Sequence, residues 1–268
     1  MLSQRWNHQR DFYRPTDDVA FDPTRYEVAP ISQDRIAKAF VLDHHYSSTY
    51  PVARWRFGMY ERGELVGVAV FSVPAGAHVL ANVFGDAGQD AIELGRFVLL
   101  DRVPKNGESW FLARAKRALR REGVSAILSF SDPQARTNAR GEKIFGGHLG
   151  VIYQASSAVY VGQAPKRTIR LLDDGTVFSA RAQQKIRSGD KGWRPASEIL
   201  ERAGAPTAPT AEGARREWLR EWLPKTTRTL RHPGNHRYAF PIHRKAQPVL
   251  QRQPFPKLHQ LDMLAEVA

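Results

Sequence analysis

The spacing of apolar and polar residues changes along the chain, and each spacing predicts a different element. Two strand-like runs, residues 54–61 and 64–73, flank the turn dipeptide Arg62-Gly63, which predicts a β-hairpin. A further strand is predicted over residues 91–100. Its end, Phe97–Leu100, is continuously apolar, as in a strand that is buried on both faces.

Helical and strand-like periods alternate after residue 100, with polar residues at the joints between them. Apolar residues recur on one helix face over 111–119, and Gly123 stands where a C-terminal cap belongs. Val124–Phe130 predicts a short buried strand that ends at Ser131-Asp132-Pro133, and residues 151–159 fit a short helix. Joints between strand ends and helix starts are where α/β proteins hold ligands.

Further elements are predicted on both sides of this region. On the N-terminal side, we expect a strand over Tyr26–Ile31 and a helix that begins after the N-cap Ser32. On the C-terminal side, the expected elements are a strand over Thr168–Leu172, a hairpin turn at Asp174-Gly175, and helices over Pro195–Gly204 and Ala214–Leu223.

The remaining stretches suggest how the chain divides. Residues 205–213 have the composition of a linker, whereas residues 181–194 and 225–245 are basic with few core-forming residues. We therefore expect an irregular N-terminal arm (1–25), a core (26–172) and a basic extension (173–268) whose tail lies on the surface.

Charge is distributed unevenly along the chain. Its 40 Lys and Arg residues against 27 Asp and Glu give a net charge of +13. Residues 1–165 contribute +3, residues 166–257 contribute +12, and the last eleven residues contribute −2. A regional excess of this kind is typical of a protein that binds a polyanion, usually nucleic acid. A merely solvated basic surface is the alternative.

The absence of cysteine excludes several classes of site. With no Cys in the chain, disulfides, thiolate zinc sites and cysteine nucleophiles are ruled out, which fits a reducing compartment. No apolar run approaches the ~18–20 residues of a membrane span. The first residues lack the apolar segment of a signal peptide, so we expect no membrane partner.

The ordered segments ELGRFVL, NGES-WFLARAKRAL, SFSDP and GHLGVIYQASSAVYVG resemble the Mom family of phage DNA-modification proteins, which are GNAT-like acyltransferases. The upstream segments HHYSSTYP and FGMYERGELVGVAVF fit the same resemblance, as does HRYAFP in the basic extension. The resemblance implies an α/β (α+β) fold, with a GNAT-like mixed central sheet flanked by helices and a basic C-terminal extension.

The same resemblance implies a function. It implies an enzyme that attaches a carbamoylmethyl (acetamido) group to the exocyclic N6 amine of adenine in DNA, which blocks restriction. Its implied partners are double-stranded DNA and an activated acyl donor. A phage-encoded protein of this kind would act in the cytoplasm of its bacterial host.

Four residues at the joints are candidate catalytic groups. Asp132 ends a buried strand, where a carboxylate would orient or deprotonate the adenine amine. Arg96 lies in an apolar strand and needs an anionic partner, for which Glu93, Asp132 or a ligand phosphate are open. Ser109 begins a helix, close to any bound phosphate or carbonyl. The resemblance makes Tyr153 a general acid.

Each of these residues also has a structural alternative. Asp132 would serve as a turn cap, and Arg96 as one half of a buried ion pair. Ser109 is a common residue at a helix start, and Tyr153 would pack in the core with one satisfied hydroxyl.

The donor is expected at the end of the strand before residue 100 and at the helix start that follows, at Val98, Leu99, Asn106, Gly107 and Ser109. Acetyl-CoA is one candidate, since N–H groups at a helix start bind pyrophosphate. However, the turn has a single Gly where GNAT proteins have Gln/Arg-x-x-Gly-x-Gly/Ala. In addition, Glu108 would compete with phosphate for the helix dipole. An aminoacyl ester is therefore an open alternative.

Metal and DNA contacts complete the expectations. His45 and His148, together with Asp132, form a candidate ligand set for iron or another divalent metal. Tyr46 is a candidate to stack on a flipped base. The basic segment supplies candidate phosphate contacts to DNA: Arg181, Lys185, Arg187 and Lys191. Trp193, in the same segment, is a candidate to stack on a base.

Two other classes of function remain open from the sequence. One is a non-catalytic nucleic-acid-binding protein on an acyltransferase scaffold, and the other is a GNAT enzyme with a different substrate. A conventional adenine methyltransferase fits less well, because Ser131-Asp132-Pro133-Gln134 matches its Asp-Pro-Pro-Tyr motif only in part. A zinc deaminase is excluded by the missing cysteines.

Overall fold

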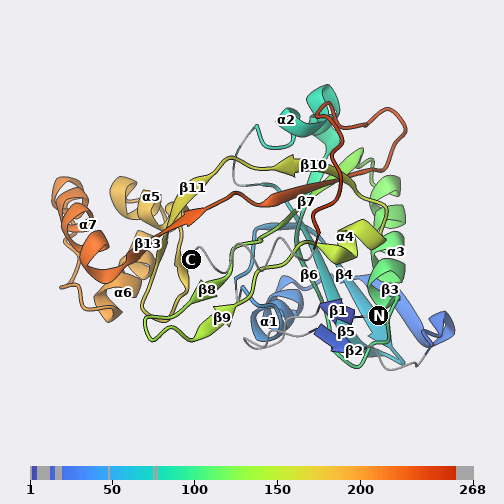
Figure 1. The fold of residues 1–268 in the computed structure, drawn as a ribbon, viewed down its shortest axis with the longest axis horizontal. Coiled ribbons are helices and arrows are strands. Elements are labelled where there is room, and N and C mark those ends of the chain that lie inside the picture. Colours follow the sequence, from blue (N-terminus) through green and yellow to red (C-terminus); the bar gives the residue numbers. More distant parts are fainter. Residues whose placement is uncertain are drawn as a thin grey trace. The chain divides into compact units, whose positions relative to one another are not determined.

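The computed structural model describes residues 2–4, 13–15, 20–47, 49–74, 76 and 78–257. Its chain forms two compact units (Figure 1). Among the described residues, the core unit comprises those up to Pro133, His148–Ala164 and those from Asn235 to Lys257. Among the described residues, the inserted unit comprises Gln134–Gly147 and Pro165–Gly234. The chain therefore leaves the core unit twice and returns to it twice.

A seven-stranded sheet forms the centre of the core unit, in the order β10-β14-β7-β6-β5-β4-β3. Neighbouring strands are antiparallel except β6 and β7, which are parallel. The strands are β3 (Tyr26–Pro30), β4 (Ala53–Glu61), β5 (Glu64–Ser72), β6 (Ile92–Leu99), β7 (Ala126–Ser131), β10 (Val159–Gln163) and β14 (His236–Pro241). The mixed sheet flanked by helices that the sequence predicts is confirmed.

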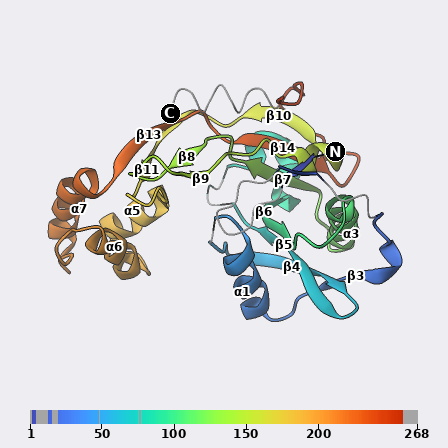
Figure 2. The same ribbon diagram turned by 60° about the horizontal axis from the view of Figure 1, so that its bottom comes forward.

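Helices cover both faces of this sheet (Figure 2). Alternate residues of a strand point to opposite faces. Accordingly, Val68 and Val70 pack with α1, and Ala69 and Phe71 with α3. The helical segments are η1 (Pro23–Arg25), α1 (Asp34–His44), α2 (Ala81–Phe84), η2 (Gly85–Asp90), α3 (Gly107–Arg121) and α4 (Val151–Ala155).

Several local predictions are confirmed by backbone geometry. Arg62 and Gly63 both have positive φ, 49° and 85°, as a two-residue hairpin turn requires. α3 ends at Arg121, and Gly123 follows with φ 80°, the conformation of a helix C-terminal glycine. The N-cap of α1, by contrast, is Gln33 and not Ser32.

β14 comes from the segment that we expected in the basic extension. It lies in the central sheet between β7 and β10, with Tyr238 opposite Ser129 and Tyr160. The Tyr238 ring is fully buried. The predicted division at residue 172 differs from the observed one because an edge-to-edge strand pairing between distant segments leaves no local signal.

The inserted unit has its own hydrophobic core. Phe178, Ile186, Leu200 and Trp218 are buried in one cluster. Its strands form a three-stranded sheet and a small hairpin, and its helices follow β12 in the chain: β8 (Arg136–Thr137), β9 (Lys143–Phe145), β11 (Arg167–Leu171), β12 (Val177–Phe178), β13 (Arg228–His232), α5 (Ala180–Ser188), α6 (Trp193–Arg202) and α7 (Glu212–Thr226).

One helix of this unit was not predicted, and one prediction for the unit is wrong. Residues 181–188 belong to α5, a helix capped by the Ser179 side chain, although few of them are apolar. Residues 205–213 do not form a free linker, because Ala205 and Ala208 are buried in the cluster. The Pro206 carbonyl also accepts a 3.0 Å hydrogen bond from the Trp218 indole. Small residues bury easily, so a linker-like composition did not exclude packing.

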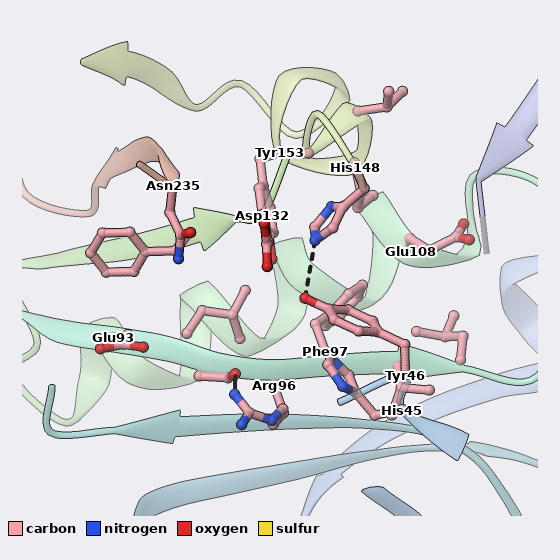
Figure 3. A pocket seen from close by; sticks show the side chains of 18 residues that line it. His45, Tyr46, Glu93, Arg96, Phe97, Glu108, Asp132, His148, Tyr153 and Asn235 are labelled. Atoms are coloured by element: carbon pink, nitrogen blue, oxygen red, sulfur yellow. Dashed lines mark hydrogen bonds between the residues drawn. The ribbon is translucent and has the colours of Figure 1, made fainter. Parts of the chain in front are cut away.

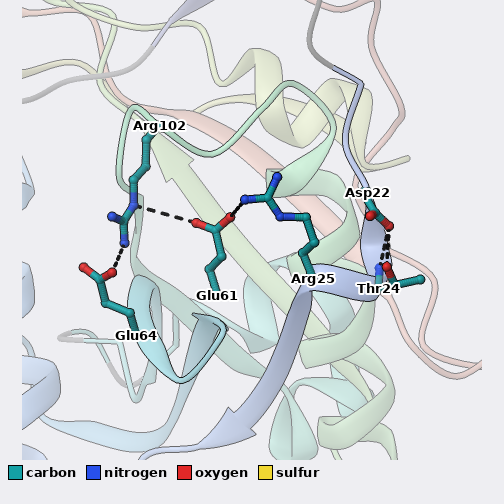
Figure 4. A network of polar contacts seen from close by, with 6 residues as sticks. All are labelled: Asp22, Thr24, Arg25, Glu61, Glu64 and Arg102. Atoms are coloured by element: carbon teal, nitrogen blue, oxygen red, sulfur yellow. Dashed lines mark hydrogen bonds and ion pairs between the residues drawn. The ribbon is translucent and has the colours of Figure 1, made fainter.

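The ends of the chain were predicted as an irregular arm and a surface tail. Within the described part of the arm, β1 (Leu2–Gln4) and β2 (Tyr13–Pro15) pair antiparallel. Where the predicted arm ends, an ion pair joins it to the sheet: Arg25 Nη2 lies 2.6 Å from Glu61 Oε1 on β4. Figure 4 shows that Glu61 also faces Arg102, whose Nε lies 3.9 Å from Glu61 Oε2. The tail prediction for residues 258–268 lies outside the described residues.

Candidate active site

A pocket of about 250 Å³ opens where the two parallel strands of the sheet part (Figure 3). β6 and β7 pair over only three positions, from Ile92↔Ile127 to Leu94↔Ser129. Beyond these positions, residues 95–99 of β6 and Phe130 of β7 line the pocket. Parting strands leave backbone polar groups without a ladder partner, so the gap is suited to a polar ligand.

A β-bulge sets the direction of the side chains on β6. Val70 pairs with Arg96 and Phe71 with Leu94, so Gly95 is the extra residue. A Cβ on Gly95 would lie 2.5 Å from the Ser72 hydroxyl oxygen, so only glycine fits. Bulges of this kind re-aim neighbouring side chains, and this one lies directly before Arg96.

The Arg96 guanidinium is held by neutral acceptors. Its Nε donates to the Thr49 carbonyl at 2.8 Å, Nη2 to the Thr49 hydroxyl, and Nη1 to the Gly95 carbonyl. These hydrogen bonds tie the guanidinium to a nearby loop. Burial lowers the pKa of Arg96, whereas the negative charge of Glu93 acts to raise it, and a guanidinium stays charged in proteins. The pocket thus holds a fixed positive charge.

Two carboxylates from neighbouring strands face this pocket, Glu93 on β6 and Asp132 after β7 (Figure 3). Burial raises the pKa of the Glu93 carboxyl, and the positive charge of Arg96 opposes this shift. A carboxylate with a raised pKa is a better proton acceptor at neutral pH than an ordinary one.

Tyr153 comes from α4 and reaches the same pocket. Burial raises the pKa of its hydroxyl, although a hydrogen bond with Ser129 and the charge of Arg96 oppose the shift. The phenol is therefore protonated at neutral pH and able to donate. Gly150, with φ 68°, starts α4, and a Cβ there would lie 2.7 Å from the Tyr153 ring.

His45, Tyr46 and His148 form one wall of the pocket. The Tyr46 hydroxyl lies 3.2 Å from His148 Nε2, and the rings of His45 and Tyr46 stack at 4.4 Å. His45 Nδ1 accepts from the Ser47 backbone N–H at 3.1 Å. Burial holds the pKa of His45 well below its ordinary value, and the positive charges of Arg96 and His148 act in the same direction.

The predicted metal ligands do not form a metal site. His45, His148 and Asp132 line the same pocket. However, among the residues that the structure describes, no group of three or more His, Asp or Glu side chains is arranged to hold a metal ion.

The start of α3 only partly matches the expected donor site. Val98 and Leu99 line the pocket, whereas Asn106, Gly107 and Ser109 are not among its lining residues. The Ser109 hydroxyl instead donates to the Asn106 carbonyl at 3.0 Å.

Glu108 does line the pocket, from the first turn of α3. A carboxylate at this position repels an anion from the helix N-terminus. The residues present therefore do not fit the pyrophosphate of coenzyme A.

Three polar residues of the pocket stand where the chain leaves or re-enters the core unit. Asp132 lies just before the first excursion and His148 directly after it, and Asn235 directly follows the second. Backbone hydrogen bonds close both excursions. The N–H of His148 donates to the Asp132 carbonyl at 2.7 Å, and the N–H of Ala164 to the Asn235 carbonyl at 2.8 Å.

The predicted DNA contacts, apart from Tyr46, all lie in the inserted unit. Arg181, Arg187 and Lys191 are exposed, and Lys185 is half-buried. The Trp193 ring is partly buried in the hydrophobic cluster of that unit, with the Arg215 guanidinium 4.6 Å from its centroid. Stacking of Trp193 on a base is therefore less favoured than phosphate contacts from the basic residues around it.

The sequence reasoning missed Asn235, and it named Glu93 only as a possible partner of Arg96. Glu93 had a usable signal, because it is a charged residue in an apolar strand, as Arg96 is. Asn235 had none, since it is far from the other site residues along the chain and reaches them only through the pairing of β14 with β7.

No helix in the described part of the chain is both long enough and apolar enough to span a membrane.

Comparisons with known proteins identify one protein family and a set of similar solved structures. The model of the Mom protein family matches residues 25–257. No curated protein matches the chain significantly.

The similar solved structures are N-acetyltransferases. One from Staphylococcus aureus Mu50 is 11% identical, with a TM-score of 0.37, and the match covers 81% of this chain and 99% of that one. The ribosomal-protein-S18-alanine N-acetyltransferase from Escherichia coli is 13% identical, with a TM-score of 0.35 and 57% and 88% coverage. A GNAT family N-acetyltransferase from Escherichia coli in complex with CoA is 10% identical, with a TM-score of 0.32 and 53% and 71% coverage.

Proposed function

Because the chain belongs to the Mom protein family over residues 25–257, we propose that it is a transferase that modifies DNA. In this proposal, it attaches a carbamoylmethyl-type group from an activated donor to the N6 amine of adenine, and so protects DNA from restriction. The observation that supports the proposal best is the grouping of Glu93, Asp132 and Tyr153 around the gap between β6 and β7.

The chemistry needs a proton acceptor and a proton donor. The N6 amine of adenine is a poor nucleophile unaided, and it gains reactivity as it loses a proton to a carboxylate. Glu93 suits this role because burial raises its pKa. Asp132 lines the same pocket and accepts a hydrogen bond from the same N6 proton, which orients the amine.

The leaving group requires a proton donor. As the bond from N6 to the transferred carbon forms, the bond from that carbon to the leaving group breaks. One N6 proton passes to Glu93, and the leaving group takes a proton from the Tyr153 hydroxyl. Solvent then returns a proton to Tyr153 and removes one from Glu93. Arg96 lies in the same pocket, where its fixed charge stabilises negative charge that develops on the donor.

The inserted unit is the proposed DNA-binding part. Its described residues carry 18 basic and 9 acidic side chains, a net charge of +9. The acidic side chains concentrate on α6 and α7, where Glu201, Glu212 and Glu221 are paired with Arg or Lys. α5 contains Arg181, Lys185 and Arg187 and no acidic residue. Unpaired cations of this kind contact the phosphate backbone.

The target base must leave the helix before it reacts. The N6 amine is paired in duplex DNA, so the adenine has to be flipped out at a cost of a few kcal/mol. Tyr46 lines the pocket and offers a ring face for the flipped base.

Mass spectrometry of nucleosides tests the proposal. DNA from bacterial cells that express the protein should contain a deoxyadenosine derivative heavier by the added group. The Asp132→Ala variant should lose this product, while a control change at an exposed carboxylate outside the pocket, Glu122→Gln, should keep it. Unmodified deoxyadenosine from cells with well-expressed, folded protein would refute the proposed function.

A further inference from the structure

Asn235 enters the pocket beside Asp132 (Figure 3). It directly precedes β14, which pairs antiparallel with β7 so that His236 lies opposite Ser131. Continuing this register by one residue puts Asn235 opposite Asp132. Directly opposed residues on antiparallel strands project to the same face, with Cβ atoms ~4.5–5.5 Å apart. A carboxamide and a carboxylate therefore face the pocket from adjacent positions.

The backbone of Asn235 is fixed on the core unit. Its carbonyl accepts the 2.8 Å hydrogen bond from the Ala164 N–H. On the other side, strand β14 continues between β7 and β10. The side chain therefore extends from an immobile point, as a group that discriminates between ligands requires.

Among the lining residues of the described pocket, Asn235 is the only carboxamide. Carboxylates such as Glu93 and Asp132 only accept when ionised, and the Arg96 guanidinium only donates. A carboxamide presents a donor and an acceptor side by side. Adenine presents the complementary pair on its major-groove edge, the N6 amine as donor and N7 as acceptor, and asparagine pairs with both.

The other bases do not offer this pair on the same edge. Guanine has two acceptors there, N7 and O6, cytosine has only the N4 donor, and thymine has only the O4 acceptor. With guanine, the carboxamide oxygen would face O6, which is also an acceptor. With a pyrimidine, the carboxamide N–H would find no N7 to accept it. In both cases a polar group is left unpaired. Unpaired polar groups in a closed site carry the largest penalties against a wrong substrate.

We propose that Asn235 is the residue that selects adenine, through its Oδ1 on one N6 proton and its Nδ2 on N7. This role rests on the proposed function, because it assumes that the pocket receives a base from DNA. The second N6 proton remains available to the carboxylates of Glu93 and Asp132. Recognition and deprotonation thus act on the two protons of the same amine.

Binding to single-stranded oligonucleotides tests this role without a donor. A labelled thymidine tract carries one central adenine, 7-deazaadenine or 1-deazaadenine, and its Kd is measured by fluorescence anisotropy at fixed salt. Backbone contacts are the same in all three, so the ratio of Kd values reports contacts to the base. The wild-type protein should bind the adenine tract ~5- to 150-fold more tightly than the 7-deazaadenine tract. The 1-deazaadenine tract should bind like adenine.

Two variants should abolish this ratio. Asn235→Ala removes both hydrogen bonds, so it should bind adenine and 7-deazaadenine tracts equally. The isosteric Asn235→Asp places an acceptor oxygen against N7, so it should bind adenine no more tightly than 7-deazaadenine. Gln247→Ala, at an exposed amide outside the pocket, should keep the wild-type ratio.

Two results would overturn the role of Asn235: a 7-deazaadenine penalty that persists in both Asn235 variants, or a wild-type ratio near one. A merely structural role for Asn235 would weaken all tracts alike and leave their ratio unchanged. The proposed function is decided separately, by the nucleosides from expressing cells. Modified deoxyadenosine without a binding ratio would reject the role of Asn235 alone.

Discussion

The backbone N–H of His148 donates a 2.7 Å hydrogen bond to the backbone carbonyl of Asp132. This bond joins the two ends of the first excursion into the inserted unit, residues 134–147. The main chain of His148 therefore helps to fix the position of Asp132. The side chain and the main chain of His148 are thus separable in their effects.

Substitutions at His148 should reveal this difference. His148→Ala removes the contact with Tyr46 but keeps the N–H. His148→Pro also removes the N–H, and the unmade bond costs ~1–3 kcal/mol and displaces Asp132. We expect the rate of adenine modification in His148→Pro to be at least ~10-fold below that of His148→Ala. Equal rates in two folded variants would contradict the role of the main-chain bond.

The raised pKa of Glu93 predicts a pH dependence of activity. If Glu93 takes the N6 proton, kcat/KM should rise with pH through an apparent pKa above the ordinary value of 4.5 for glutamate. Glu93→Gln should lower the rate ~10²–10⁴-fold and remove this limb of the profile. A profile that keeps its limb in the Gln variant would assign the proton transfer to another group.

The same shift has a consequence for stability, with a definite sign. A folded-state pKa above 4.5 means that the protonated carboxyl stabilises the fold at low pH, and that this contribution is lost as pH rises through the folded pKa. Glu93→Gln stays neutral at every pH. Urea unfolding should therefore show the Gln variant gaining stability relative to wild type as pH rises above the ordinary glutamate value of 4.5.

Tyr153→Phe tests the proton donor. Removal of the hydroxyl should lower kcat ~10²–10⁴-fold while the fold is kept, because the ring still packs against Tyr238 and Phe240. Tyr60→Phe, on β4 and away from the pocket, is the matched control and should keep full activity. Full activity in Tyr153→Phe would show that solvent, and not Tyr153, protonates the leaving group.

Gly95→Ala should damage the bulge that precedes Arg96. The new Cβ would lie 2.5 Å from the Ser72 hydroxyl oxygen and 3.1 Å from Pro51 Cγ. Overpacking of this kind costs ~1–3 kcal/mol. Adding Ser72→Ala removes the closer atom, so the double variant should recover part of the lost stability in thermal unfolding. Strict additivity of the two changes would show that another contact causes the loss.

The salt dependence of DNA binding tests the cations of α5 and of the turn that follows it in the inserted unit. Neutralising Lys185, Arg187 and Lys191 should reduce the slope of log Kd against log salt for duplex DNA by ~0.9 for each lost phosphate contact. As a control, neutralising Arg216 and Lys225, which already pair with glutamates on α7, should change the slope less. An unchanged slope in the first variant would place the DNA contacts elsewhere.

Several residues of the candidate site could be predicted from the sequence. Arg96 was singled out inside an apolar strand, Asp132 and Tyr46 at the ends of apolar segments, and Tyr153 from the family resemblance. All four line one pocket. This was predictable because burial makes a charged or polar residue in an apolar strand costly unless it has a task. The same reasoning, applied to Glu93, would have added the second carboxylate.

The partners of these residues could not be predicted in the same way. Arg96 is satisfied by Thr49, across a loop, and Ser109 turns to its own helix start instead of the pocket. Which acceptor a guanidinium meets depends on how a bulge aims it and on which loop passes nearby, and neither is written in local periodicity.

The sequence by itself determined the local elements and the region of charge. The turn at Arg62-Gly63, the apolar face of α3 and the basic excess after residue 165 depend only on neighbouring residues. Tertiary structure alone decided that β14 lies beside β7 and that Asn235 lines the same pocket as Asp132. The physical reason is that strand pairing is made by backbone groups, which are alike in every residue, so the register between distant segments emerges only when the whole sheet packs.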